Sequence, residues 1–357
     1  MNSTECPAWL PLPLSFEAVT PEWLSLALAP GFPGVQVKAL RMSGHRAGTS
    51  SSARLELSCE QPGSKLPPTL YIKGGFADSM RRRVWGGLET EVRFFQRVAP
   101  GLCIHIPRAH FAGVDTENRQ AIVILEDLDP RGVTFGHATR PLDADAMARL
   151  MALLASLHAQ WWQRPELGEL VAGSGTQRLF VKFLLRPASW AGVLERPYAH
   201  LIPSALREAA VVGQALDRLW ALNDGRVPTL VHGDSHSGNL FFERDGTPGL
   251  MDWQCAQQGH WAHDVMWTIV CAMTVADRRR HERHLIEHYL AELARHGVAA
   301  PGFDEAWLAY RQNLMYGVSC GVANPYDMQS EEVTCISAER ILAAVTDLEA
   351  ARSLGIG

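Results

Sequence analysis

The two kinds of hydrophobic periodicity in this sequence occupy different parts of the chain. Alternation of apolar and polar residues, which is typical of half-buried strands, is concentrated in roughly the first 125 residues. The predicted strands are residues 35–42, 53–58, 69–73, 110–114 and 121–125, and one predicted helix, 87–98, interrupts them. Strands that precede helices, rather than alternate with them, favour an α+β fold over a βαβ repeat.

Helical periodicity dominates the rest of the chain. The predicted helices are residues 143–162, 205–222, 260–275, 278–296, 305–317 and 331–353. An earlier helix is predicted to begin at Thr20-Pro21, because a hydroxyl caps a first turn and proline fits the first helical position. A chain of 357 residues can bury two cores, and the change of pattern places the boundary between residues 1–126 and 127–357.

The charge and the cysteines exclude several classes of protein. With 33 basic and 38 acidic residues the net charge is −5, which gives no general attraction for nucleic acid or an anionic membrane. The longest apolar run, residues 265–276, is too short to cross a bilayer, and the N-terminus has no signal-peptide pattern. Seven scattered cysteines suggest reduced thiols. We therefore expect a cytoplasmic protein, a monomer or homodimer, without nucleic-acid or membrane partners.

One short segment interrupts the helical half of the chain. Residues 229–242 place a polar loop between two apolar runs, and a third apolar run ends at Asp252. The turn formers of residues 244–246 predict a small hairpin. This hairpin would present Asp234, Asn239 and Asp252 from one edge.

These three residue types suit phosphoryl transfer to a hydroxyl group. A carboxylate such as Asp234 can accept a hydrogen bond from the attacking hydroxyl and take up its proton. A second carboxylate, Asp252, and the amide of Asn239 supply the hard oxygen ligands that Mg²⁺ prefers. Asp and Asn are also common turn formers, so the segment persuades only together with residues elsewhere in the chain.

At this point the chain resembles a known family. Residues 232–239 read HGDSHSGN and residues 251–254 read MDWQ, which is similar to the aminoglycoside phosphotransferase, choline kinase and ecdysteroid-kinase-like group. That group is distantly related to the protein kinases. The resemblance implies a bilobal protein-kinase-like fold. Residues 1–126 would form a nucleotide-binding lobe, and residues 127–357 a lobe for catalysis and substrate binding.

Matches in the same order extend over roughly residues 40–290. Lys73, in LYIKGG, resembles the family's lysine for nucleotide phosphates, and Glu91, in ETEVRFF, resembles the helix glutamate that pairs with it. The run ILEDL, which includes Glu126 and Leu128, is similar to the hinge that receives adenine through backbone groups. The resemblance thus implies ATP and Mg²⁺ as cofactors, with Asp234 as the base and Asn239 and Asp252 as metal ligands.

The sequence also departs from the family pattern. The loop expected over the phosphates, residues 44–52, has two glycines instead of a full GxGxxG, and we expect Gly48, Thr49 and Ser50 to contact phosphate there. Asp252 is followed by Trp-Gln where Phe-Gly is usual. A protein-kinase activation segment is missing, which points to a small-molecule substrate.

The histidines near the loop allow several readings. His232 is expected to bond the backbone of the loop, and Asp264 to brace that loop through hydrogen bonds. His236 is close enough in sequence to touch substrate or metal-bound water. His260, His263 and Asp264, together with His232, raise a zinc hypothesis for a hydrolase, but the spacing of His260 and His263 is not the His-x3-His of helical zinc ligands.

The predicted function is ATP-dependent transfer of a γ-phosphoryl group to a small-molecule hydroxyl. Likeness of ETEVRFF and ILEDL to the ecdysteroid-kinase-like branch favours a neutral or lipophilic alcohol; an aminoglycoside or other antibiotic is the alternative substrate. A nucleotide-binding pseudokinase or scaffold is the alternative function. The complete set of Lys73, Asp234, Asn239 and Asp252 argues against it, because degraded sites usually lose one of these.

Overall fold

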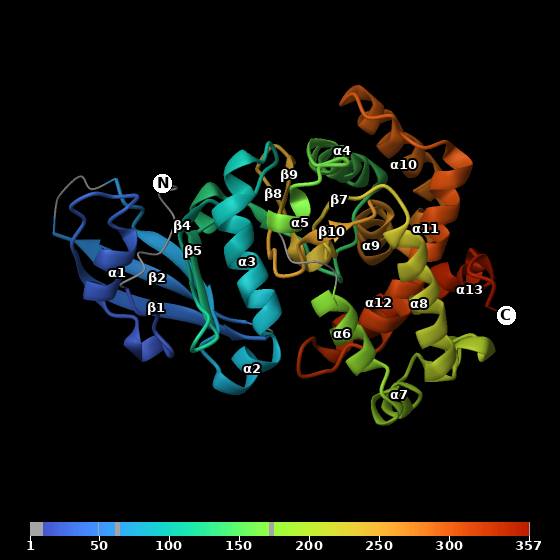
Figure 1. Ribbon diagram of the computed structural model, residues 1–357, viewed down its shortest axis with the longest axis horizontal. Coiled ribbons are helices and arrows are strands. Elements are labelled where there is room, and N and C mark those ends of the chain that lie inside the picture. Colours follow the sequence, from blue (N-terminus) through green and yellow to red (C-terminus); the bar gives the residue numbers. More distant parts are fainter. Residues whose placement is uncertain (1–9, 49, 61–64, 171–174, 357) are drawn as a thin grey trace. The chain divides into compact units, whose positions relative to one another are not determined.

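In the computed structural model, which describes residues 10–48, 50–60, 65–170 and 175–356, the predicted strands form one five-stranded antiparallel sheet (Figure 1). Its strands, in spatial order, are β1 (Val37–Ala47), β2 (Ser51–Cys59), β3 (Thr69–Gly74), β5 (Gln120–Glu126) and β4 (Ala109–Asp115). In β3, Ile72 pairs with Ile124 and Lys73 with Val123. Because side chains alternate along a strand, Ile72 and Lys73 point to opposite faces of the sheet.

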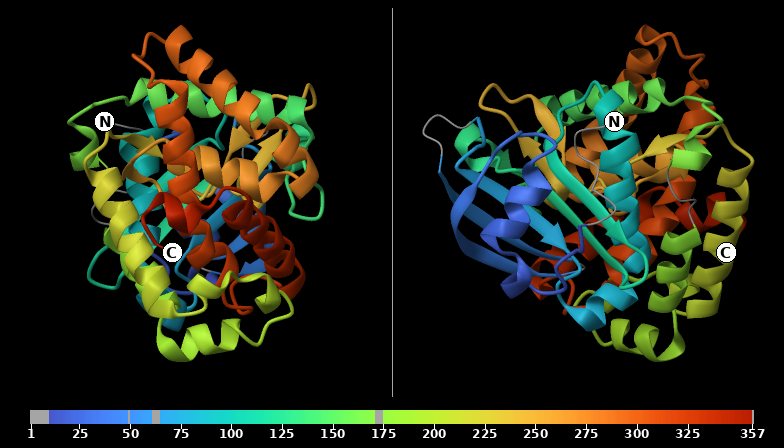
Figure 2. Two further views of the ribbon diagram at one scale, coloured as in Figure 1. Left: turned by 90° about the vertical axis from the view of Figure 1, so that its right-hand side faces the viewer. Right: turned by 60° about the vertical axis from the view of Figure 1, so that its left-hand side comes forward.

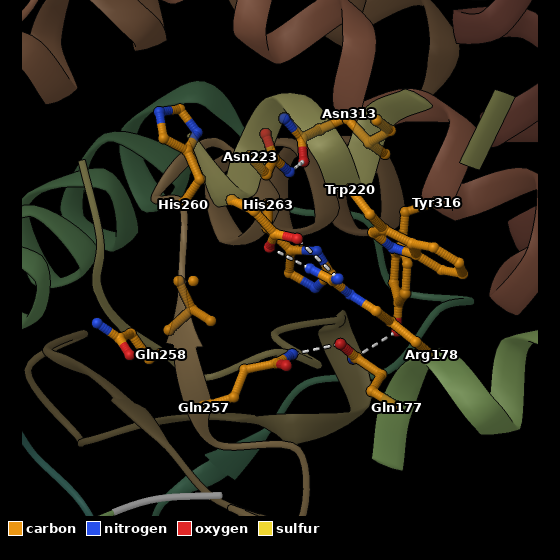
Figure 3. A pocket seen from close by; sticks show the side chains of 14 residues that line it. Gln177, Arg178, Trp220, Asn223, Gln257, Gln258, His260, His263, Asn313 and Tyr316 are labelled. Carbon is orange, nitrogen blue, oxygen red and sulfur yellow. Dashed lines mark hydrogen bonds and ion pairs between the residues drawn. The ribbon is translucent and has the colours of Figure 1, made fainter. Parts of the chain in front are cut away.

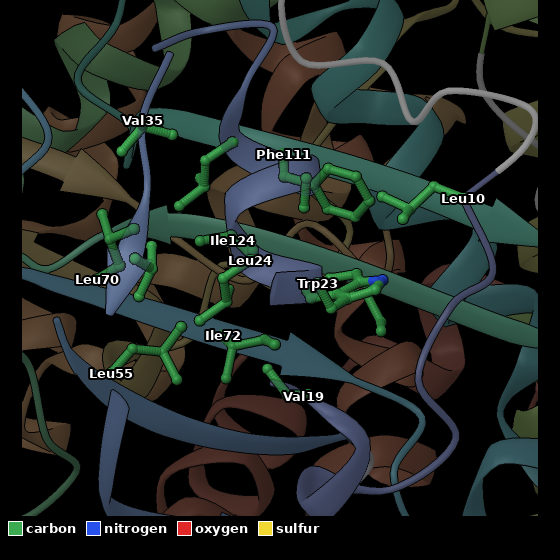
Figure 4. Close-up of a cluster of buried hydrophobic side chains, with 14 of the residues drawn as sticks. Leu10, Val19, Trp23, Leu24, Val35, Leu55, Leu70, Ile72, Phe111 and Ile124 are labelled. Carbon is green, nitrogen blue, oxygen red and sulfur yellow. The ribbon is translucent and has the colours of Figure 1, made fainter. Parts of the chain in front are cut away.

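Helix α1 (Pro21–Leu28) covers the face that carries Ile72. It begins as predicted: the Thr20 hydroxyl accepts a hydrogen bond from the backbone N–H of Trp23 at 3.1 Å, and Pro21 occupies the first turn. The ring of Trp23 meets Phe111 edge-on at 5.4 Å, within the apolar cluster shown in Figure 4. This core contains side chains from all five strands, so it fixes the sheet on which Lys73 is mounted.

Helix α3 (Trp85–Arg97) packs on β4 and β5 and buries Leu88, Val92 and Phe95. The stripe of apolar residues predicted a helix at 87–98, and this prediction is confirmed. A short helix, α2 (Asp78–Arg83), precedes it. Since Glu91 lies on the buried side of α3, this helix brings a carboxylate toward the face of the sheet that carries Lys73.

The second half of the chain is mainly helical. Its long helices are α4 (Ala144–Gln160), α8 (Ala209–Asp224), α9 (Ala262–Ala272), α10 (Val275–Arg295), α11 (Phe303–Gly317) and α12 (Glu331–Asp347). All six overlap the predicted helices. Helix α10, orange in Figure 2, packs against α4, which is green.

Two of these helices end earlier than the periodicity predicts. Helix α9 stops at Ala272 because the Thr274 hydroxyl caps α10 instead, accepting from the backbone N–H of Asp277 at 3.1 Å. The stretch 331–353 contains two helices, α12 and α13 (Ala350–Ser353), which are separated at Glu349, where φ is +48°. A local cap or a residue with a left-handed backbone thus ends each helix, although the apolar stripe continues beyond that point.

The structure adds elements that periodicity does not predict. They are α5 (Leu167–Leu170), α6 (Gly175–Leu184) and α7 (Pro187–Val193). Short 3₁₀ turns occupy Phe16–Ala18, Ala99–Gly101, Asp129–Arg131, Ala199–Leu201, Ser204–Leu206 and Ser237–Asn239, and a π-helical turn occupies Val318–Val322.

The polar segment of the helical half forms the hairpin that its turn residues predict. Strand β8 (Leu240–Phe242) pairs antiparallel with β9 (Pro248–Leu250), and β6 (Thr134–Phe135) pairs with the other edge of β8. The turn closes at Gly246, where φ is +83° and the backbone N–H donates to the carbonyl of Glu243. Strand β7 (Thr229–Val231), which precedes the loop, pairs with β10 (Gln257–Gly259).

Contacts divide the chain into two compact units. Unit 1 comprises Met1–Leu102, Ile106–Val133 and Asp252–Cys255, and unit 2 comprises Cys103–His105, Thr134–Met251 and Ala256–Gly357. The sheet lies in unit 1 and the long helices lie in unit 2, which confirms the predicted α+β fold class. A division of function after residue 126 stays a prediction. Within the described residues, no helix combines the length and apolar character needed to cross a bilayer.

Replacing Gly249 by Ala is expected to destabilise the hairpin. A Cβ on Gly249 would lie 2.1 Å from Cζ of Phe241, whose side chain is fully buried. The free energy of unfolding should fall by about 1–3 kcal/mol, as for overpacked cores. Gly213→Ala is the matched control: a Cβ at this position in α8 meets nothing within 4 Å, so stability should rise by about 0.5–1 kcal/mol. Urea unfolding measures both, and equal stability of Gly249→Ala and wild type would contradict the packing.

Candidate active site

Lys73 forms two ion pairs within unit 1. Its Nζ lies 2.9 Å from Oε1 of Glu91 and 2.8 Å from Oδ1 of Asp252. Lys73 is 8% exposed and Glu91 is 2% exposed, whereas the Asp252 side chain is about one-third exposed (35%). The structure thus brings together three residues that lie far apart in the sequence and that motif matching selected separately.

The members of this cluster shift each other's pKa values. Burial alone would lower the pKa of Lys73, but the carboxylates of Asp252 and Glu91 outweigh burial and raise it above its ordinary value. Burial raises the pKa of Glu91, and the nearby Asp252 raises it further against the effect of Lys73. The Lys73 ammonium group therefore lies between two carboxylates, of which that of Asp252 is the more exposed. Such a cluster is suited to a cation on the exposed side of Asp252.

The backbone of Asp252 adopts an unusual conformation. Its φ is +64°, a left-handed value that costs a non-glycine residue about 1–3 kcal/mol unless its surroundings hold it there. The next residue supplies that hold: the backbone N–H of Trp253 donates to Oε1 of Glu91 at 3.2 Å. The indole of Trp253 also stacks on Phe94, with ring centroids 4.0 Å apart. The tryptophan that departs from the family pattern therefore anchors Asp252.

In unit 2, a buried carboxylate holds the loop that carries Asp234. Asp264, in the first turn of α9, accepts hydrogen bonds from the backbone N–H groups of His232 at 2.6 Å and Gly233 at 2.9 Å. Burial alone would raise the pKa of Asp264, but His158 above all, then His263 and His232, lower it below the ordinary value. The hydrogen bonds are those expected of a residue that braces the loop.

Histidines around this carboxylate are engaged with the protein itself. His158 contacts Oδ2 of Asp264 at 3.3 Å and the hydroxyl of Tyr289 at 2.8 Å, and it is fully buried. His232 accepts from the backbone N–H of Asp234 at 3.2 Å through Nδ1, so its Nε2 donates to the carbonyl of Met251 at 3.0 Å. His232 therefore bonds the backbone of its own loop.

The carboxylate of Asp234 is held at one of its two oxygens. The indole N–H of Trp267 donates to Oδ1 at 3.0 Å, while Nε2 of His236 is 3.7 Å from Oδ2. The Asp234 side chain is 33% exposed. Sequence reasoning missed Trp267, although Asp264, Trp267 and Thr268 share one face of α9 at i, i+3 and i+4.

Asn239 is oriented so that its amide oxygen can act as a ligand. Its Nδ2 donates to the backbone carbonyl of Asp234 at 2.8 Å, which leaves Oδ1 as the other polar atom of the side chain. Its own carbonyl accepts from the backbone N–H of Met251, the residue that precedes Asp252. An amide oxygen is a hard donor of the kind that Mg²⁺ requires, and so is the partly exposed carboxylate of Asp252 in unit 1. Each of the two residues is by itself a suitable ligand for this ion.

The predicted phosphate loop contains fewer residues than the sequence suggests. The sequence predicts a loop at 44–52, but β1 continues to Ala47 and β2 begins at Ser51, and Ala47 pairs with Ser51. Gly48 and Ser50 lie in the turn that remains, and Thr49 lies outside the described residues. Small and hydroxyl side chains therefore do not prevent strand pairing here.

The predicted hinge residues lie at the end of β5. Oε1 of Glu126 accepts from the backbone N–H of Arg108 at 2.8 Å and from Nη1 of Arg131 at 2.9 Å. Leu128 is buried, and its carbonyl accepts from the backbone N–H of Arg131. A role of these residues toward adenine stays a prediction.

A polar pocket lies behind the loop in unit 2 (Figure 3). Gln177 and His263 both donate to the carbonyl of Gly233, at 2.9 Å and 3.0 Å, and Gln177 also donates to the hydroxyl of Tyr316. His260 lines the same pocket, and burial lowers its pKa to about 3. Across the described parts of the chain, no three His, Cys, Asp or Glu residues are placed to hold a metal ion, which gives the zinc hypothesis no support.

Comparison with known proteins identifies the family. The model of the phosphotransferase enzyme family matches residues 83–310, more than half of the 357 residues, and the chain therefore belongs to this family. The membership confirms the predicted resemblance and the predicted class of enzyme, a phosphotransferase with an alcohol group as acceptor. Comparison with curated proteins finds no match.

Solved structures of several kinases resemble the chain at low identity. Choline kinase LicA from Streptococcus pneumoniae is 12% identical, with a TM-score of 0.47 over 88% of this chain and 94% of that one. A microcompartment-associated aminopropanol kinase is 13% identical, with a TM-score of 0.49 over 94% and 99%. Spectinomycin phosphotransferase APH(9)-Ia, in complex with ADP and spectinomycin, is 13% identical, with a TM-score of 0.45 over 93% and 99%.

The free energy of unfolding should decrease as the pH falls from about 6.5 toward 4. The folded protein excludes a proton from His260 until about pH 3, whereas the unfolded chain binds one below about pH 6.5, so acid favours the unfolded state. Replacing His260 by Gln should make the decrease shallower by up to about 1.4 kcal/mol per pH unit. Urea unfolding between pH 7 and 5 measures this, with the exposed His284→Gln as the control. Equal slopes for wild type and His260→Gln would contradict it.

Proposed function

We propose that this small-molecule kinase transfers the γ-phosphoryl group of ATP to a hydroxyl group, using Asp234 as the base. The observation that carries the proposal is the buried Lys73, whose ammonium contacts Glu91 at 2.9 Å and Asp252 at 2.8 Å. A buried lysine fixed by a helix glutamate is the arrangement that positions nucleotide phosphates in kinases. Family membership independently supports phosphoryl transfer.

Residues of unit 1 would bind the nucleotide. Lys73 would contact the α- and β-phosphates, because its charge is held in place by Glu91 and its pKa keeps it protonated. Gly48, Thr49 and Ser50 would contribute further contacts to phosphate. Backbone groups of Glu126 and Leu128 would receive the adenine ring. Apart from Thr49, which lies outside the described residues, these residues belong to the sheet of unit 1 or to its connections.

Asp234 would orient the acceptor hydroxyl and hold its proton. As the acceptor oxygen bonds to the γ-phosphorus, the hydroxyl proton passes to the Asp234 carboxylate. The bond from the γ-phosphorus to the bridging oxygen breaks, and its electron pair leaves with ADP. Partial exposure of Asp234 and the hydrogen bonds that hold its loop support this role, since catalysis in this class depends mainly on positioning.

Asp252 and Asn239 would hold Mg²⁺ through a carboxylate oxygen and an amide oxygen. When bound, the ion neutralises negative charge on the phosphates. The partial exposure of the Asp252 carboxylate and the orientation of the Asn239 amide support this assignment. His232 and Asp264 would keep the loop in shape, and His236 would lie within reach of the acceptor.

A neutral or lipophilic alcohol is the proposed class of acceptor. In unit 2 the group that donates to Asp234 is the uncharged indole of Trp267, and Tyr316 packs against this indole. A polycationic aminoglycoside needs carboxylates to receive its ammonium groups. The acidic residues Glu331 and Glu332 lie instead in the exposed first turn of α12.

Asp234→Asn and Asp252→Asn should each lower turnover at least about 100-fold, because one removes the proton acceptor and the other a metal ligand. The measurement is ADP release from Mg-ATP with 1-hexanol, a steroid alcohol, choline and kanamycin as acceptors. Asp245→Asn is the matched control, because it removes one exposed carboxylate from the same hairpin and an asparagine suits the turn. Thermal unfolding should show all three variants folded.

Each outcome of this assay assigns a different function. Full turnover by Asp234→Asn would show that another group is the base. Preference for kanamycin over every neutral alcohol would assign the aminoglycoside alternative. A wild-type protein that binds ATP, measured by calorimetry, but releases no ADP with any acceptor or with water would be the pseudokinase or scaffold.

A further inference from the structure

We propose that Trp267 is a positioning residue that selects which oxygen of Asp234 faces the acceptor; this inference rests on the proposed role of Asp234 as the base. The indole N–H of Trp267 donates to Oδ1 of Asp234 at 3.0 Å. Trp267 lies on α9 and is 4% exposed, whereas the Asp234 side chain is 33% exposed. The hydrogen bond thus runs from the core of unit 2 to a carboxylate that solvent can reach.

The hydrogen bond makes the two carboxylate oxygens of Asp234 different. Oδ1 accepts from the indole at 3.0 Å, while among the described residues Nδ2 of Asn239 lies 3.5 Å and Nε2 of His236 lies 3.7 Å from Oδ2. Contacts of this length are weak or absent as hydrogen bonds. Oδ2 is therefore the less engaged of the two oxygens, and the one more open to a hydroxyl donor. Without the indole, the carboxylate could rotate about its last torsion, which is broad in aspartate.

The indole is itself held in one orientation. Tyr316 packs edge-on against it, with ring centroids 5.4 Å apart at 77°. A Cβ on Gly317 would lie 3.4 Å from Cζ3 of Trp267, and a Cβ on Gly321 would lie 3.2 Å from its Cη2. Two glycines at the end of α11 and in the following π-helical turn thus allow the backbone to pack closely on the ring. Such π-helical turns often occur at functional sites.

Packing alone does not explain the partner of this indole. The buried Trp23 and Trp190 donate to backbone carbonyls, those of Pro11 at 2.9 Å and Arg207 at 2.7 Å. Trp267 instead donates to the charged side chain of the proposed base. A charge-assisted hydrogen bond of this kind is stronger than one to a carbonyl and orients both partners. The geometry therefore favours a role in turnover over a purely structural role.

The test replaces Trp267 by Phe, which removes the N–H and keeps an aromatic ring against Tyr316. ADP release from Mg-ATP is measured with water and with the best alcohol of the panel as acceptors. We expect kcat to fall about tenfold while KM for ATP stays within about twofold, because only the orientation of the base is lost.

Trp261→Phe is the matched control. Trp261 directly precedes α9, six residues before Trp267, is 1% exposed and stacks on Tyr289 at 4.9 Å. Both Phe variants should melt at similarly lowered temperatures, but Trp261→Phe should keep the wild-type kcat. A loss of kcat that is equal in the two variants would overturn the positioning role.

Trp267→His provides a second variant, because imidazole retains an aromatic N–H on a smaller ring. If the role of Trp267 is purely structural, Trp267→Phe should have the higher kcat, since Phe fills more of the space. If Trp267 positions the base, Trp267→His should have the higher kcat, since it keeps an N–H donor. Wild-type kcat in Trp267→Phe would overturn the inference and leave the proposed function intact. A wild-type protein that turns over no ATP would overturn the proposed function, and with it the inference.

Discussion

Asp264 is the residue on which the geometry of the helical unit depends. A fully buried carboxylate is costly unless hydrogen bonds compensate its charge, and Asp264 finds its donors in two consecutive backbone N–H groups, those of His232 and Gly233. Both donors can face one side chain only if the loop turns sharply, which Gly233 permits with a φ of +81°. The shape of the loop, and so the direction of Asp234, follows from satisfying this one charge.

Unit 1 contains a second buried carboxylate that accepts a hydrogen bond from the backbone. Glu91 is buried and accepts both from Lys73 and from the backbone N–H of Trp253, so it also fixes the residue next to a proposed site carboxylate, Asp252. In each unit, a buried acid that is not itself a proposed reacting group determines where an accessible acid lies. Such separate positioning and site carboxylates suit phosphoryl transfer, because catalysis in this class depends on positioning and charge rather than on covalent chemistry by the protein.

Residues with a local or motif-based signature could be predicted from the sequence. The start of α1 followed from Thr20-Pro21, and the pairing of Lys73 with Glu91 followed from two short motifs. The helices α5 to α7 could not be predicted, because they are short and their stability comes from tertiary packing rather than from a long apolar stripe. The length of the loop around Gly48 was overestimated, because residues with turn-forming side chains can also pair in a strand.

Trp267 shows why a motif does not describe a whole site. The motif residues Asp234 and Asn239 are only five positions apart in the sequence, so their type and spacing reveal them. Trp267 contacts Asp234 across 33 residues of sequence, and this contact exists only because α9 returns to the loop through Asp264. The same helix therefore provides both the brace for the backbone and the donor for the carboxylate. Any change that tilts α9 must alter both together, so the orientation of the proposed base is coupled to the packing of Tyr316, Gly317 and Gly321 against this helix.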